Sequence, residues 1–130
     1  MKAVIYTPDN DEYSVIVRII NKSTKDPDIY RAPLDGHGHF SARFDIAVIA
    51  VNGAEGMEIM LELCDRFPDT KIIWITDDKH FAGMAIRKHI SGFILRDYNE
   101  DTLSAAINEA VTKCSETTTW HFGKKKPGKS

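Results

Sequence analysis

From residue 45 onward, apolar runs typical of buried strands alternate with segments typical of amphipathic helices. This alternation constrains the fold more than any other feature of the sequence. Residues 46–51 (IAVIAV) and 71–76 (KIIWIT) are continuous apolar, β-branched runs, and GFIL at 92–95 is a shorter one. Such runs are typical of strands buried on both faces, which occur mainly in parallel sheets covered by helices. With short connections between them, the pattern predicts right-handed β-α-β units in an open parallel sheet.

The segments between these strands have apolar residues at helical spacing. The expected helices cover residues 54–67, a stretch reaching about residue 89, and residues 100–114. Pro68 ends the first of them, and Asp77, Asp78 and Asn99 are candidate N-terminal caps for the other two. The second half of the chain is therefore expected to be a regular α/β structure.

The first forty residues are less regular. Residues 3–7 (AVIYT) read as a strand, whereas 12–20 (EYSVIVRII) fit either a second strand or part of a helix over 11–22. We favour the helix, because the rest of the chain calls for a β-α unit here and local propensity is often overridden. Residues 28–32 predict a short strand. The stretch 33–43 holds two glycines and a proline in eleven residues, so the second helix is expected to be shortened or missing.

Composition sets the class but not the activity. The chain has 130 residues, with 42% hydrophobic and 28% charged residues, as in one folded domain, and has no long apolar run. Its two cysteines lack the spacing of a metal site, which favours a reducing cytoplasm. Four lysines fall in the last seven residues, leaving 13 basic against 19 acidic side chains elsewhere. We therefore expect a folded domain over 1–115, a disordered basic tail over 116–130, and no direct binding of nucleic acid.

Three segments are similar to the second half of a response-regulator receiver domain, in order and in spacing. They are FDIAVIAVNGAEGMEIM (44–60), PDTKIIWITDD (68–78) and AIRKHISGFILRDYNEDTLSAAINEA (85–110). The resemblance extends over residues 2–112 and is weakest between 23 and 43. It implies a doubly wound (βα)5, flavodoxin-like α/β fold with strand order 2-1-3-4-5, and a site at the carboxyl ends of the strands.

The resemblance also implies a phosphoacceptor site, most of whose chemical groups are missing here. Receivers use an aspartate nucleophile after the third strand, two acids after the first strand that hold Mg²⁺, a hydroxyl after the fourth and a lysine after the fifth. In this sequence those roles fall on Ala50, on Thr7 and Pro8, on Thr76 and on Arg96. The carboxylate of Asp9 comes one residue late, and Asn52 lies in a shortened loop. The resemblance thus implies a degenerate receiver with no catalytic residue, metal or cofactor, and not an enzyme.

Arg96 is the residue of this set that calls for a new partner. A guanidinium at the mouth of the sheet, without phosphate or metal, needs a carboxylate. We expect Asp9, Asp77 or Asp78 to supply it, and we hypothesise that the pair mimics the charge balance of a phosphorylated site and holds one conformation.

The family's relay and interaction surface can also be placed. The relay residues match Thr76 and Phe93, which without a trigger read as a strand-end threonine and a core phenylalanine. The surface on which receivers dimerise or bind partners would include Phe81, Arg87, Lys88, Asp97, Tyr98 and Asn108.

The remaining motifs have simpler readings. His37-Gly38-His39 is a close histidine pair, but no third ligand stands near it, so we interpret it as a polar loop. Cys64 and Cys114 fall on inward helical stripes and read as buried apolar residues. The Asn52-Gly53 pair reads as a turn only.

Taken together, the sequence predicts a stand-alone, non-phosphorylatable receiver-like module of bacterial two-component signalling, located in the cytoplasm and without membrane association. It would act by binding a protein partner, including a second copy of itself, since too little chain follows residue 112 for a DNA-binding domain. Two alternatives stay open. One is a sensor of a small anionic ligand beside Arg96 and Thr76, and the other is a residual Mg²⁺-dependent phosphoacceptor that uses Asp9 and a rim aspartate.

Overall fold

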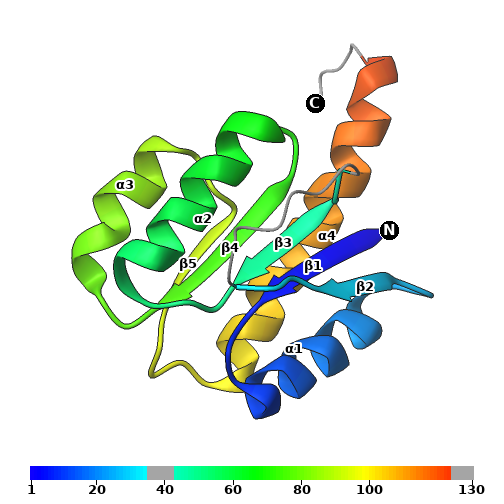
Figure 1. The fold of residues 1–130 in the computed structure, drawn as a ribbon. Coiled ribbons are helices and arrows are strands. Elements are labelled where there is room, and N and C mark those ends of the chain that lie inside the picture. The colour runs from blue at the N-terminus through cyan, green and yellow to red at the C-terminus, as the bar shows by residue number, and fades with distance from the viewer. Residues whose placement is uncertain (35–42, 124–130) are drawn as a thin grey trace.

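A computed structural model describes residues 1–34 and 43–123, and its five strands form one parallel sheet (Figure 1). The strands are β1 (Lys2–Tyr6), β2 (Asp28–Arg31), β3 (Ile46–Ile49), β4 (Lys71–Thr76) and β5 (Gly92–Leu95). They lie in the order β2-β1-β3-β4-β5, and every neighbouring pair is parallel. The predicted α/β class and the predicted strand order are therefore confirmed.

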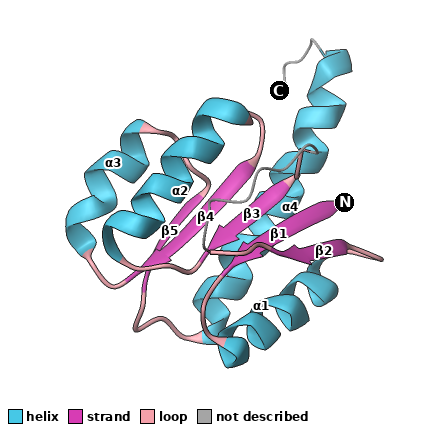
Figure 2. Cartoon of the chain, in the orientation of Figure 1, coloured by secondary structure: helices cyan, strands magenta, loops and turns pink. Residues whose placement is uncertain are grey.

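Helices cover both faces of this sheet, with α1 and α4 on one side and α2 and α3 on the other (Figure 2). They are α1 (Asn10–Ser23), α2 (Gly53–Arg66), the 3₁₀ turn η1 (Lys79–Phe81), α3 (Ala82–Arg87) and α4 (Glu100–Gly123). In the described part of the chain, no helix is both long enough and apolar enough to cross a bilayer.

Helix α4 is longer than expected. Its predicted end was about Cys114, but the helix continues to Gly123 and extends past the sheet (Figure 1). Residues 116–123, which we had assigned to a disordered tail, are therefore helical, and 124–130 lie outside the described residues.

The stretch from residue 12 to 20 is part of helix α1, as we favoured, although its β-branched residues would suit a strand. Asp9 caps the helix, because its side chain accepts hydrogen bonds from the backbone N–H groups of Asp11 and Glu12. Ile16, Ile19 and Ile20 then fall on one face and are buried against the sheet. Burial of this face outweighs the weak local preference for a strand.

The crossover between β2 and β3 lies partly outside the described residues. Of the connecting residues, 32–34 and 43–45 are described and form no helix, whereas 35–42 are not described. The expected shortening of the second helix and the reading of His37 and His39 as a polar loop fall on that segment and stay predictions.

A tryptophan in the central sheet fixes the loop after β3. Trp74 is fully buried, and its indole Nε1–H donates to the carbonyl oxygen of Val51 at 3.0 Å. Gly56, in the first turns of α2, packs against both groups. A Cβ atom at Gly56 would lie 2.0 Å from the Val51 oxygen and 2.7 Å from Trp74 Nε1. The path of the chain from Val51 into the first turn of α2 therefore requires glycine at position 56.

Gly56→Ala is expected to lower the free energy of unfolding by about 2 kcal/mol or more, because the clash is with backbone and cannot be relieved by a rotamer change. Gly83→Ala in α3 is the matched control, since a Cβ there meets nothing within 4 Å. The control should be at least as stable as the wild type, because alanine favours helix. Urea denaturation measures both, and equal stability of the two variants would contradict the packing described.

Candidate functional site

The carboxyl ends of four parallel strands meet at one edge of the sheet. Thr7 follows β1, Ala50 follows β3, Thr76 ends β4 and Arg96 follows β5. Parallel pairing brings these four positions together, as the resemblance implied. Among them, Thr7, Ala50 and Thr76 are buried, and Arg96 is the charged group.

All three nitrogens of the Arg96 guanidinium donate hydrogen bonds. Nη1 contacts both carboxylate oxygens of Glu12 at 2.5 Å, and Nη2 donates to the carbonyl oxygen of Ala50 at 3.0 Å. Nε donates to Oδ1 of Asn52 at 3.2 Å. The planar guanidinium fork thus joins helix α1 to the loop between β3 and α2.

Glu12 is the buried carboxylate of the site. It lies in the first turn of α1, with only 8% of its side chain exposed, against 31% for Arg96. Two further groups donate to it: the hydroxyl of Thr7 at 3.2 Å and the phenol of Tyr98 at 3.0 Å. Arg96, Thr7 and Tyr98 together satisfy the carboxylate, as a buried charge requires.

The predicted partners of Arg96 were wrong, since its carboxylate comes from Glu12. Asp9 is committed to capping α1 and accepts from Asp11 N at 2.9 Å. Asp78 caps η1 and accepts from His80 N at 2.9 Å. Asp77 takes part only through its backbone N–H, which donates to Asn52 Oδ1 at 3.1 Å.

Hydrogen bonds hold the loop between β3 and α2 to residues at the carboxyl ends of β4 and β5. Asn52 precedes α2 without capping it, and its side-chain oxygen instead accepts from Arg96 and from Asp77. Gly53, at φ +68°, donates its N–H to the hydroxyl of Thr76 at 3.3 Å. Our reading of Asn52-Gly53 as only a turn was incomplete, because Asn52 also bridges β4 and β5 at the site.

The positions that would hold a metal ion in a receiver are filled differently here. The Thr7 hydroxyl donates to Glu12 and accepts from the backbone N–H of Asp9 at 3.1 Å. Pro8 is exposed and its side chain offers no ligand atom, and Ala50 presents a fully buried methyl group. Within residues 1–34 and 43–123, no cluster of three or more acidic, histidine or cysteine side chains is arranged to hold a metal ion.

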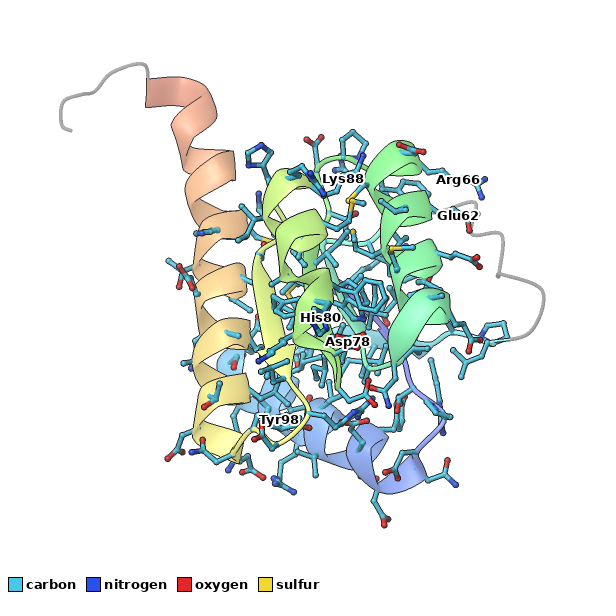
Figure 3. The ribbon with its side chains drawn as sticks, turned by 90° about the vertical axis from the view of Figure 1, so that its left-hand side faces the viewer. Glu62, Arg66, Asp78, His80, Lys88 and Tyr98 are labelled. Atoms are coloured by element: carbon cyan, nitrogen blue, oxygen red, sulfur yellow. The ribbon has the colours of Figure 1, made fainter. Side chains whose placement is uncertain are left out.

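Tyr98 belongs to this site and not to the outer surface on which we had placed it. Figure 3 shows it at the junction between β5 and α4. Burial, together with the negative charge of Glu12, raises the pKa of Tyr98 to about 12. The phenol therefore stays protonated at physiological pH and serves as a hydrogen-bond donor to the carboxylate.

Thr76 and Phe93 lie on adjacent strands, as the relay positions require. The Thr76 hydroxyl is fully buried and accepts the hydrogen bond from Gly53. Phe93 is half-buried, with its ring edge-on to that of Trp74 at a centroid distance of 5.6 Å. Their placement fits the core reading we gave them, and a relay role stays a prediction.

A shallow pocket of about 410 Å³ opens beside Arg96. It is lined by Asp77, Asp78, Lys79, His80, Leu95, Arg96 and Asp97. Asp78 and His80 lie together near the start of α3 (Figure 3), with Asp78 Oδ1 2.8 Å from His80 Nδ1. Hydrogen bonds from the backbone and side chain of His80 lower the pKa of Asp78. With three carboxylates among its lining, the pocket does not concentrate positive charge.

Of the six residues predicted for the interaction face, two are half-buried and four are exposed, and their binding of a partner stays a prediction. Phe81 is half-buried and packs on Trp74, with ring centroids 5.3 Å apart, so like Tyr98 it points inward. The other members, Arg87, Lys88, Asp97 and Asn108, are exposed. Two apolar residues that were not predicted for this face are also exposed: Ile86 in α3, at 72%, and Leu95 in β5, at 38%.

The two cysteines, Cys64 and Cys114, were predicted to be buried, and both are half-buried thiols that form no disulfide with each other. Burial raises the pKa of both thiols. A raised thiol pKa lowers the thiolate fraction and hence the reactivity. Neither thiol contributes to the carboxyl-end site.

Arg96→Met should lower the free energy of unfolding by about 3 kcal/mol, because it leaves the Glu12 carboxylate buried without its cation. Adding Glu12→Gln removes that charge, so the double variant should be more stable than Arg96→Met alone. Arg18→Met is the control, since Arg18 pairs with Glu100 at the surface, and an exposed pair contributes about 1 kcal/mol at most. Urea denaturation of the wild type, Arg96→Met, Glu12→Gln and the double variant measures the coupling. Losses at Arg96 and Glu12 that simply add would show that the pair is not coupled.

Comparison with known proteins supports the fold. No protein-family model and no curated protein matches the sequence. Solved structures do match, among them the response regulatory domain of mrkE from Klebsiella pneumoniae, with a TM-score of 0.72 and 16% identity over 89% of this chain and 99% of that one. The REC domain of AraT from Geobacillus stearothermophilus matches with a TM-score of 0.71 and 17% identity over 90% and 97%.

A third solved structure has similar coverage. The CheY-like receiver domain protein of Methanospirillum hungatei matches with a TM-score of 0.68 and 15% identity, over 89% of this chain and 97% of that one. Near-complete coverage of all three shows that the similarity extends over the whole domain. The chain therefore has the fold of a response-regulator receiver domain.

Proposed function

We propose that this chain is a receiver-like signalling module that does not accept a phosphoryl group and acts by binding a protein. The observation that carries the proposal is the Arg96–Glu12 ion pair at the carboxyl ends of the strands, beside a methyl group at Ala50. The solved domains that share the fold come from response regulators, which supports a role in signalling. We propose a reducing compartment, the cytoplasm, because the thiols of Cys64 and Cys114 are not joined in a disulfide.

Phosphoryl transfer to a carboxylate needs a nucleophile and positive charge that is free to stabilise the phosphoryl oxygens. Ala50 supplies no nucleophile. The positive charge of Arg96 is already balanced by Glu12, at 2.5 Å. Thr7 and Pro8 offer no carboxylate for a metal ion, so the nucleophile, the metal ligands and the unpaired cation of the family's chemistry are missing at these positions, and only the hydroxyl of Thr76 is kept.

The two alternative functions have less support from the geometry. An anion sensor would need Arg96 and Thr76, but Arg96 is paired with Glu12, and the Thr76 hydroxyl is buried against Gly53. A residual phosphoacceptor would need Asp9, whose carboxylate caps helix α1. Either function would require breaking contacts that stabilise the site.

The binding surface we propose is the side of the molecule formed by α3, β5 and α4. Ile86 and Leu95 expose apolar surface there. Lys88 lies at the end of α3 opposite to Asp78 (Figure 3). Asp77, Asp78 and Asp97 lie at the Asp78 end together with Lys79 and His80, and Arg87 and Lys88 lie at the other end. A second copy related by a twofold axis would bring the cationic end, with Arg87 and Lys88, against the acidic end, with Asp97. A homodimer is therefore one form that this binding takes.

Acetyl phosphate and Mg²⁺ should leave the mass of the intact protein unchanged, because no carboxylate in the site is placed to attack. Intact-mass spectrometry measures this directly, with a receiver that retains its aspartate as the positive control in the same reaction mixture. A stable adduct with the mass of one phosphoryl group, on the folded chain, would refute the proposed function.

Dimerisation through the α3–β5 side should be lost on charge reversal. Arg87→Glu with Lys88→Glu is expected to shift the protein from dimer to monomer, and adding Asp97→Lys should restore the dimer by reversing both ends of the contact. Size-exclusion chromatography with light scattering measures the mass. Asp65→Lys, an exposed residue of α2 on another surface, is the control. A wild type that is monomeric at high concentration would rule out the second copy as partner.

A further inference from the structure

We propose that the Arg96–Glu12 pair is a conformational lock. The Arg96 guanidinium occupies the site as a cation that cannot dissociate, and its hydrogen bonds hold the loops at the carboxyl edge of the sheet in one arrangement. This inference rests on the proposed function in one respect, that no phosphoryl group or metal ion enters the site. It goes further by assigning the pair a mechanical role.

The first part of the lock joins α1 to the loop between β5 and α4. Glu12 on α1 accepts from Arg96 and from Tyr98, which flank the exposed Asp97. Asn99, the next residue, caps α4 by accepting from the N–H of Thr102 at 2.9 Å. The path of this loop is therefore set by a carboxylate on a helix from the other end of the sequence.

The second part joins the same guanidinium to the loops after β3 and β4. Arg96 donates to the carbonyl oxygen of Ala50 and to Asn52 Oδ1, and the same Asn52 oxygen accepts from Asp77 N. Gly53 next to it is bound to Thr76. A change at Glu12 thus has a continuous route of hydrogen bonds to Asp77, although Glu12 makes no direct contact with that loop in the hydrogen bonds described.

The burial of the Glu12 carboxylate keeps the ion pair, and with it the loops, in a single conformation. Glu12 has 8% of its side chain exposed, and no side-chain nitrogen or oxygen buried in the described residues lacks a hydrogen-bond partner. Separating the pair would leave a charge in a low-dielectric setting, which costs several kcal/mol unless water or another ion replaces the partner. A cation bound by a covalent chain cannot dissociate, so the loops do not alternate between an occupied and an empty site.

Amide hydrogen exchange by NMR on the full chain tests the lock. Glu12→Gln should speed exchange at the Asp77 and Gly53 amides by about tenfold or more, because Asn52, which accepts from Asp77 and directly precedes Gly53, loses the support of Arg96. The Ile73 amide in β4 is the internal reference for global unfolding, and exchange at Asp77 and Gly53 is compared with it.

Two further variants make the test specific. Arg96→Lys keeps a charge for Glu12 but lacks the fork that reaches Ala50 and Asn52, so it should also speed exchange at Asp77 and Gly53 while preserving the fold. Glu100→Gln makes the same chemical change in the exposed Arg18–Glu100 pair, which also joins α1 to α4, and should leave both amides at the wild-type rate.

Wild-type exchange rates at Asp77 and Gly53 in both Glu12→Gln and Arg96→Lys would overturn the lock. So would an equal effect of Glu100→Gln. Neither result would bear on phosphorylation, whereas a phosphoryl adduct on the wild type would refute the proposed function without altering the exchange comparison.

Discussion

A single buried ion pair determines what the carboxyl edge of this sheet can do. Parallel strands leave their carboxyl ends on one edge, where loops converge and ligands usually bind. In this chain the convergence point holds Arg96 and Glu12 at 2.5 Å, with Thr7 and Tyr98 completing the carboxylate's hydrogen bonds. Because Glu12 balances the charge of Arg96, we propose that the site does not attract a phosphoryl group, and the rest of the account depends on that.

The fold of a receiver does not depend on the residues of its phosphoacceptor site, and we propose that this chain has the fold without the phosphoryl-transfer chemistry. The sheet and its helices are stabilised by apolar burial, such as that of Trp74 and Ile16, which needs no residue at the carboxyl edge. The edge residues are therefore free to differ, and similarity to receivers at 12–18% identity fits a scaffold conserved in shape. For the proposed signalling function this leaves the surface, where Ile86 and Leu95 are exposed.

The sequence predicted most of the fold because its strands and helices have strong periodicity. The strands at 71–76 and 92–95 match β4 and β5 residue for residue. The site was only partly predictable. Arg96 was identified by its position after a strand, but Glu12 was missed, since a glutamate in the first turn of a helix usually reads as a solvent-exposed partner of the helix dipole. Its one available signal was its place on the buried face of α1, one helical turn before Ile16. Tyr98 was misplaced because loop residues give no periodicity from which to infer which way a side chain points.

The central claim is that the Arg96–Glu12 pair leaves no place for a phosphoryl group. The most direct test is an NMR titration of the ¹⁵N-labelled chain with beryllofluoride and Mg²⁺, which mimic the phosphoryl group and its metal ion. The amide signals of Asn52, Gly53, Asp77 and Arg96 report on the site. The account predicts that these signals stay where they are throughout the titration. Saturable shifts confined to these residues would show that the edge accepts a phosphoryl mimic and would contradict the central claim.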